Sequence, residues 1–484
     1  MTVMISRSSI VAAVAALTAC APPRPSISGR PAAPPTPDSY WTPPSGEIAA
    51  LPAVTRPSTR MPNLAALSLA DVVDLSLRNN LATRISWAQA LSAADEYGAA
   101  RGALFPSLTA DVSATRSLSL STPTRPAGER TQYGPSLSLS YLVFDFGGRG
   151  GRIAIARKTA VAASLAHNVV VQNTILATES AVFNHLGTRA LRDAQGVVVQ
   201  EATTNLAAAQ DRHEVGLATI ADVLQAKTAL SQAQLALETL DGALDVSRGA
   251  VAVAMGLPAT TPFDVPNVVA SDSVEFISQS FDSLIAVAEQ ARPDFAAARA
   301  QVAAAAANVR MASAANRPAL LLGTTSGYTG SNAVGFSGRT YSINLGLQLP
   351  VFTGLTNEYH ARQASDELLA ASARGDQLRQ EIMLQVLTAY SGLQTSTRRV
   401  HTAADLLASA QQSEQVALGR YREGVGSIVD LLIAQSALAD ARAQSIQTRW
   451  QWRQALAQLA HDVGTLGIRG EPTLTRDMNP GYKR

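Results

Sequence analysis

The chain contains the same series of residues twice, and this repeat restricts its fold more than any other feature. The stretch from Arg212 reads RHEVGLATIADVLQAKTALSQAQ, and the stretch from Arg420 reads RYREGVGSIVDLLIAQSALADAR. A constant shift of 208 residues aligns the two arginines and also aligns Gly216 with Gly424. A shared order of residues at one fixed shift indicates a tandem duplication, in which each copy folds into the same supersecondary unit.

The repeat extends upstream of these two stretches. The same shift of 208 residues places the Val-Phe pair at 143–144 on the Val-Phe pair at 351–352. Further upstream, Pro106 in GALFPSL corresponds to Pro318 in ANRPALL, at a shift of 212. The four-residue difference falls between the prolines and the Val-Phe pairs, where a loop can absorb it.

Each copy is predicted to contain the same elements in the same order. The first copy has a helix at about 69–102, alternating segments from 107 and 132, a long helix at 151–214 and a returning helix at about 220–255. In the second copy, the corresponding positions are 282–316, 319, 340, 356–422 and 428–462. Neither long stretch contains proline, and a glycine turn follows each one.

The alternating segments predict a sheet with one apolar and one polar face. Leu137, Leu139 and Tyr141 alternate with serines, and the segment from Thr340 alternates in the same way. The outer face of a membrane β-barrel is one surface with this pattern. No later stretch has 18 consecutive apolar residues. We therefore expect no transmembrane helix, so that any membrane crossing needs closed β structure.

The two long helical stretches are too extended to form a globular core. About 64 residues at about 1.5 Å each give roughly 95 Å of helix. Aromatic residues make up only 5% of the chain, and small residues are frequent, as in the alanine run from Ala303. Such helices pack closely against neighbours, so the pattern favours a subunit of a helical tube.

The N-terminus reads as a secretory signal peptide at 1–19, followed by a proline-rich tether at 20–66. The signal ends in LTAC, which resembles a bacterial lipobox with Cys20 as the acylated first residue of the mature protein. The alternative is an ordinary signal peptide with an incidental cysteine. The expected boundaries beyond the tether are 67–257 for the first repeat, 258–281 for a linker, 282–463 for the second repeat and 464–484 for a tail.

Sequence patterns of enzymes and of nucleic-acid binding are absent. The net charge of +2 comes from 39 basic and 37 acidic residues, so we expect no nucleic-acid partner. GGRGGR at 147–152 is not followed by the lysine of a phosphate loop, and the next acidic residue after it is Glu179, deep in a predicted helix with no returning parallel strand, which favours a structural turn over a nucleotide site. The six histidines are scattered, and neither HExxH nor GxSxG occurs. We therefore predict no enzymatic activity, no cofactor and no metal.

The duplication, the VFDFGGR and PVFTG junctions, and the two reversals together resemble the TolC-like outer membrane efflux family. RPDFAAARAQ from Arg292 also resembles the opening of that family's second repeat. The resemblance extends from about Leu67 to Gly464, and the LTAC motif points to the lipoprotein branch of the family.

The resemblance implies a homotrimer with a mainly α fold. Each subunit would contribute four strands to a shared twelve-stranded β-barrel in contact with outer-membrane lipid. The helices would form a periplasmic α-barrel that narrows at its tip. The barrel-to-helix junction would then contain Phe144, Gly147, Gly148, Phe352 and Gly354.

The family's helix reversals are its tips, and they contact a periplasmic adaptor protein. Carried over residue by residue, this implies that the adaptor-contacting turns contain Gly216, Leu217, Gly424 and Gly426. Where the best-studied member has a gate arginine, this sequence has Gly426, so fewer charged links are expected to hold the tip closed.

The resemblance also implies a gate at the tip. Tyr421 and Asp222 match a tyrosine–aspartate link of the family, and Asp430 matches an aspartate that lines the narrowest ring. Ile433 stands where the best-studied member has a second lining aspartate. An alternative role for both aspartates, compatible with gating, is to complement the dipole at a helix N-terminus.

The function that the resemblance implies is a passive export duct in the outer membrane of a Gram-negative bacterium. Such a duct serves a tripartite efflux pump or a type I secretion system, together with the adaptor and an inner-membrane efflux pump or ABC exporter. The alternative is a coiled-coil envelope lipoprotein without a pore. The alternating strands count against it, because a spacer needs no sheet with one apolar face.

Overall fold

The computed structural model describes residues 26–27, 30–31, 64, 66–120, 123, 128–266, 274, 279–332 and 337–466. The chain divides into two compact units, at 1–61 and 62–484. In the first unit, the described strands β1 (Ser26–Ile27) and β2 (Arg30–Pro31) pair antiparallel. Cys20 and the predicted signal peptide lie outside the described residues.

The second unit consists of six elements that occur twice in the same order. The first set is α2 (Leu69–Asn79), α3 (Leu81–Gly102), β3 (Ser107–Ser119), β4 (Gly128–Phe144), α4 (Gly148–Glu214) and α5 (Ile220–Ala254). The second set is α6 (Phe281–Ala291), α7 (Pro293–Ala314), β5 (Ala319–Ser331), β6 (Gly338–Gln348), α8 (Thr356–Arg422) and α9 (Ile428–Asp462). Corresponding helices have equal lengths of 11, 22, 67 and 35 residues. The tandem duplication is therefore confirmed.

The first helix of each copy is broken, and here the prediction of one continuous helix was wrong. Asn80 has an extended backbone (ψ 132°), and its side chain accepts a hydrogen bond from the Ala82 N–H at 2.7 Å, which starts α3. In the second copy, Arg292 is extended (ψ 121°) because the ring of Pro293 disfavours helical backbone in the preceding residue. Each break turns one short helix, α2 or α6, away from the longer helix that follows.

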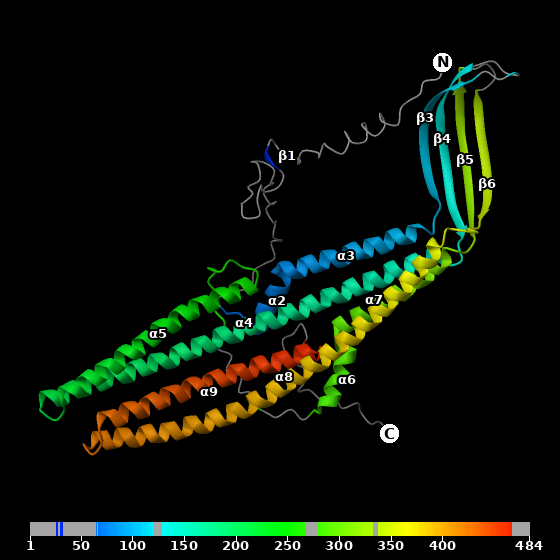
Figure 1. Ribbon diagram of the computed structural model, residues 1–484. Coiled ribbons are helices and arrows are strands. Elements are labelled where there is room, and N and C mark those ends of the chain that lie inside the picture. The colour runs from blue at the N-terminus through cyan, green and yellow to red at the C-terminus, as the bar shows by residue number, and fades with distance from the viewer. Residues whose placement is uncertain are drawn as a thin grey trace, which may run out of the picture. The chain divides into compact units, whose positions relative to one another are not determined.

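The four long strands form one antiparallel sheet in the order β3-β4-β5-β6 (Figure 1). The β4–β5 pair joins the two copies, whereas β3 and β6 are the edges of the sheet within the chain. Leu137 lies opposite Ala110 on one side and opposite Ser326 on the other, which assigns each strand's alternate residues to one face. This face carries Leu108, Val112, Leu118, Tyr133, Leu137, Tyr341, Ile343, Leu345 and Leu347, all at least 45% exposed. The predicted exposed apolar face is present.

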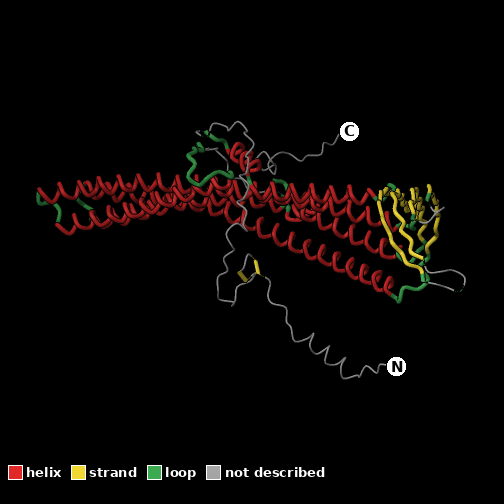
Figure 2. Tube along the Cα trace, turned by 90° about the horizontal axis from the view of Figure 1, so that it is seen from above, coloured by secondary structure: helices red, strands yellow, loops and turns green. Residues whose placement is uncertain are grey.

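The long helices lie side by side and leave the sheet at one end of the bundle (Figure 2). α4 packs against α3, α5, α7 and α9, and α8 packs against α7 and α9. The two largest clusters of buried apolar side chains lie where α6 packs on α8 and where α2 packs on α4. The core is thus concentrated part-way along the helices, and only small clusters hold the far end together.

Among the described helices, α4 alone is long and apolar enough to cross a membrane by length and composition. Only 17% of its most apolar window is buried within the chain. At about 1.5 Å per residue, its 67 residues extend about 100 Å, roughly three times the hydrocarbon thickness of a bilayer. Much of α4 must therefore lie outside any bilayer.

Candidate functional site

Both long helices end in the same glycine turn. Gly216 (φ 77°) donates its N–H to the carbonyl oxygen of His213 at 3.0 Å, and Leu217 donates to that of Arg212 at 2.7 Å. Gly424 (φ 75°) ends α8 with the same pair of bonds. A side chain in this left-handed conformation costs about 1–2 kcal/mol, so glycine is the favoured residue at the reversal. We call the two reversals, residues 211–222 and 419–430, the tip.

Both tip aspartates stabilise the start of a returning helix. The Asp222 carboxylate accepts hydrogen bonds from the Thr219 N–H at 2.8 Å and the Thr219 hydroxyl at 2.9 Å, and the Asp222 N–H donates back at 3.3 Å. Asp430 and Ser427 form the same capping box, with a hydroxyl-to-carboxylate distance of 2.8 Å. Both aspartates therefore stabilise a helix N-terminus, which is the alternative role predicted for them. The gating role remains a prediction.

Arg212 joins the two reversals. Its guanidinium lies 4.4 Å from the ring centre of Tyr421, and it donates to the carbonyl oxygens of Tyr421 and Arg422, both at 3.0 Å. The Tyr421 hydroxyl is buried and has no hydrogen-bond partner among the described residues. The predicted bond from Tyr421 to Asp222 is thus not formed within this chain. The sequence comparison aligned Arg212 with Arg420 but did not predict any contact for Arg212.

Position 426 is a glycine because neighbouring atoms leave little room for a side chain. A Cβ at Gly426 would lie 3.0 Å from the Cβ of Arg420 and 3.2 Å from the backbone nitrogen of Tyr421. A larger residue would have to displace the end of α8. Asp430 and Ile433 lie on the surface of the chain, with Ile433 64% exposed, so any narrow ring needs further copies to surround it.

The sheet-to-helix junction turns through left-handed residues in both copies. Phe146 (φ 51°) and Gly147 (φ 104°) connect β4 to α4, and Gly354 (φ 64°) and Leu355 (φ 67°) precede α8. The rings of Phe144 and Phe146 meet edge to face at 4.7 Å between centroids. The predicted turn at the paired glycines is confirmed. Gly148 starts α4, and Phe352 of the second copy is 80% exposed.

A pair that sequence reasoning missed fastens the first junction. The Asp145 carboxylate accepts the backbone N–H of Arg149 and, at 3.4 Å, that of Gly147. The Arg149 guanidinium donates to the carbonyl oxygens of Leu142 at 2.7 Å and Ala103 at 3.3 Å. One arginine thus ties the end of β4 and the end of α3 to the start of α4. An acid and a base flanking the glycine pair were the available sequence signal.

Glu179 is a buried carboxyl group in the middle of α4. It is 2% exposed, and its Oε1 has no hydrogen-bond partner among the described residues. Burial raises the pKa of this carboxyl to about 7. Its neighbour Thr178 contacts the hydroxyl of Ser76 on α2 at 2.8 Å, so α2 covers this part of α4. No local sequence signal marks Glu179, because its burial depends on helices distant in sequence.

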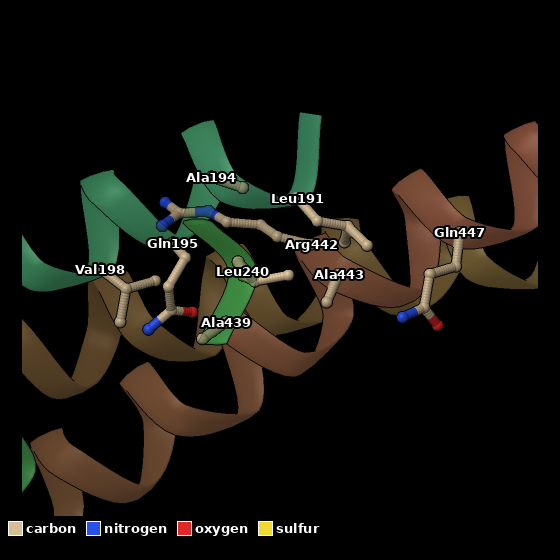
Figure 3. A pocket seen from close by; sticks show the side chains of 9 residues that line it. All are labelled: Leu191, Ala194, Gln195, Val198, Leu240, Ala439, Arg442, Ala443 and Gln447. Atoms are coloured by element: carbon tan, nitrogen blue, oxygen red, sulfur yellow. The ribbon is translucent and has the colours of Figure 1, made fainter. Parts of the chain in front are cut away.

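The described residues hold no group of three metal-ligating side chains. A hollow of about 130 Å³ between α4, α5 and α9 is lined mainly by aliphatic side chains (Figure 3). Arg442 crosses it from α9 and forms an ion pair with Glu201 of α4 at 3.0 Å. The hollow is a packing gap between three helices, and the side chains that line it include no nucleophile and no acid–base pair.

Known proteins resemble the chain over most of its length. The sequence model of the family described as Outer membrane efflux protein matches residues 72–257 and 284–465, one match on each copy. Protein CyaE of Bordetella pertussis is 30% identical over 448 residues, covering 90% of this chain and 93% of the relative. The pyoverdine export outer membrane protein OpmQ of Pseudomonas aeruginosa is 28% identical over 354 residues, covering 69% and 68% respectively. The solved structure of VceC, an outer membrane protein of Vibrio cholerae, superimposes with a TM-score of 0.72 at 20% identity, over 82% of this chain and 96% of that one.

Proposed function

The chain belongs to the outer membrane efflux protein family, and from this premise we propose that it is the outer-membrane duct of an export system. It is a passive channel that receives its cargo from an inner-membrane efflux pump or ABC exporter through a periplasmic adaptor. The observation that carries the proposal is a sheet with an exposed apolar face joined to helices about 100 Å long. The non-pore envelope spacer is not favoured, because such a protein needs no lipid-facing sheet.

Assembly into a homotrimer is part of this proposal. In the part of the chain that the structure describes, β3 and β6 are the two edge strands of the sheet, and each has one side without a neighbouring strand. A bilayer does not tolerate open edges, since each unpaired group loses its hydrogen bonds to water. Three copies would close twelve strands into a barrel, with the apolar face toward outer-membrane lipid.

The tip is the part proposed to form the gate and to contact the adaptor. Two apolar side chains of the tip are largely exposed, Leu217 at 79% and Val425 at 68%, and so is Ile433 just beyond it, at 64%. The buried Tyr421 hydroxyl finds no acceptor among the residues that the structure describes, which costs about 1–3 kcal/mol. A small movement on assembly that brings it to the Asp222 carboxylate would satisfy it and hold the tip closed.

Lipid anchoring at Cys20 completes the proposal. The LTAC motif after an apolar segment supports acylation, and the proline-rich stretch that follows is suited to a tether. The anchor would hold the mature N-terminus in the outer membrane beside the barrel.

Conductance through planar bilayers tests the duct. We expect the purified protein to insert and form discrete ion-conducting channels, and we expect cells that lack it to lose resistance or secretion. A purified oligomer that never conducts, even with the tip destabilised, would favour the spacer.

A further inference from the structure

We propose that Asp111 makes the barrel section of the duct favour cations, so that charge selection takes place within the outer membrane and not at the tip. The inference rests on the proposed function, because it requires the polar face of the sheet to line a water-filled bore. It adds the class of cargo that passes most easily: cationic and neutral polar solutes, with anionic solutes disfavoured in dilute salt.

The strand registers place Asp111 on the polar face of the sheet. Asp111 lies opposite Ser136 of β4, which lies opposite Gly327 of β5. Successive side chains of a strand point to opposite faces, so Asp111 faces away from Ala110 and from the apolar face that holds Leu137. When the apolar face meets lipid in a closed barrel, the polar face lines the bore.

Hydroxyl groups, amides and glycines make up the middle of this polar face. Three successive rows across β3, β4, β5 and β6 contain Ser107, Ser140, Gly323 and Asn344; Thr109, Ser138, Thr325 and Ser342; and Asp111, Ser136, Gly327 and Thr340. The hydroxyl oxygens of Ser138 and Thr325 lie 3.5 Å apart, as expected for side chains on one face. Asp111 is the single charged residue in these three rows, so its carboxylate dominates the electrostatics of this part of the wall.

The Asp111 carboxylate is free to act on ions in the bore. It is exposed, and it forms no hydrogen bond or ion pair with the residues that the structure describes. On the polar face of the described strands the one cationic side chain is Arg130, which lies opposite Ser117, six residues along β3 from Asp111 or about 20 Å. Arg116 and Glu129 pair with each other at 2.5 Å on the lipid-facing side. The described strands therefore leave the charge of Asp111 without a counter-ion.

The width of the bore sets the size of the effect. Twelve strands about 4.8 Å apart and tilted by about 40° enclose a backbone ring of about 12 Å radius. The Debye length is about 10 Å in 0.1 M salt and about 3 Å in 1 M salt. Three carboxylates at about 12 Å, screened over about 10 Å, favour cations over anions about threefold at the axis. In 1 M salt the preference at the axis almost disappears, because the charges act only close to the wall.

The tip would select ions differently. Asp222 and Asp430 each accept hydrogen bonds at the start of a helix, and Gly426 and Ile433 carry no charge. A carboxylate in a narrow constriction meets passing ions at close range, so its effect would persist in concentrated salt. The salt dependence of ion selectivity therefore distinguishes a filter in the wide barrel from one at the tip.

Reversal potentials across planar bilayers test the filter in the full-length protein. In potassium chloride near 0.1 M, we expect potassium to permeate about three times as well as chloride. Asp111→Asn keeps the shape of the side chain and removes its charge, so the ratio should fall to about one. Asp111→Lys should invert the ratio in favour of chloride. In about 1 M salt, the unmodified protein and both variants should all be close to unselective.

A relocated charge provides the matched control. Ser113 lies on the same face of β3, two residues from Asp111, and opposite Gly134. Asp111→Asn combined with Ser113→Asp should restore the cation preference, whereas Asp111→Asn combined with Ser113→Asn should not. Light scattering in detergent checks that each variant has the same oligomeric state as the unmodified chain.

The outcomes separate this inference from the proposed function. Channels whose permeability ratio in dilute salt is the same with Asp111 and with Asp111→Asn overturn the filter and leave the duct standing. A cation preference that is equally strong in dilute and concentrated salt assigns selection to the tip and also overturns the inference. An oligomer that forms no channel in any variant overturns the duct, and the inference fails with it because no bore exists.

Discussion

Replacing Glu179 by glutamine is expected to stabilise the protein at neutral and alkaline pH but not in acid. Burial raises the pKa of this carboxyl from 4.5 to about 7. At about 1.4 kcal/mol for each pH unit, the difference corresponds to about 3 kcal/mol per chain. Glutamine has nearly the same shape and carries no charge, so Glu179→Gln removes the cost of ionisation and keeps the packing.

The direction in which the free energy of unfolding changes with pH follows from proton binding by the folded and unfolded states. Below 4.5 the carboxyl is protonated in both states, and stability is at its highest. As the pH rises toward 7, the unfolded chain loses its proton first, so the folded state loses stability relative to it. Above about 7 both states are ionised and the full loss of about 3 kcal/mol remains. The advantage of the glutamine variant should follow the same curve.

Unfolding in guanidinium, followed by helical circular dichroism at about pH 4.5 and about pH 8, measures this difference. The variant should unfold at a higher denaturant midpoint at the alkaline pH and at the same midpoint in acid. Glu238→Gln, at an exposed position on α5, is the matched control and should change neither midpoint. An equal effect at both pH values, or none at either, would show that burial does not raise the pKa of Glu179 in the assembled protein, and would refute the reasoning.

Four further outcomes are expected. Mass spectrometry of the mature N-terminus should find acylated Cys20, and an unmodified N-terminal residue elsewhere would defeat this prediction. Analytical ultracentrifugation in detergent should find a trimer and no stable folded monomer. Tyr421→Phe combined with Asp222→Ala should raise single-channel conductance and sensitise cells to large antibiotics; unchanged conductance with trimers intact would exclude this link as the gate. Arg149→Ala should destabilise the junction by roughly 1–3 kcal/mol in thermal unfolding, whereas the exposed control Arg152→Ala should not.

The sequence predicted the long helices well because their limits are encoded locally. The predicted helices 356–422 and 428–462 have the bounds of α8 and α9, since a proline-free stretch ends at Gly424 and a new helix begins after a capping serine. The break at Asn80 was missed because asparagine also occurs inside helices. Here its side chain bonds the backbone two residues on, and that choice becomes clear only in the fold.

The candidate site was predictable to a lesser extent, for a related reason. The reversing glycines and the capping aspartates carry their signals within a few residues, and they stand where expected. The contact of Arg212 with Tyr421 spans 209 residues of chain, and the burial of Glu179 needs a helix about 100 residues away. Such contacts depend on how helices far apart in the chain pack against each other, which no local pattern encodes.

The differences between the two copies also separate features encoded locally from contacts between helices distant in the chain. Both copies keep the reversing glycine and the capping box, because a helix reversal depends on residues close together in the sequence and is the same in each copy. They differ where a side chain meets another helix: Glu179 corresponds to Leu387, and Gly151 corresponds to Tyr359. Glu179 is buried against helices of its own chain, whereas Leu387 is 44% exposed and free to meet a neighbour. A duplicated chain in a ring has one internal joint and one external joint, so its two halves keep the same backbone and need different surfaces.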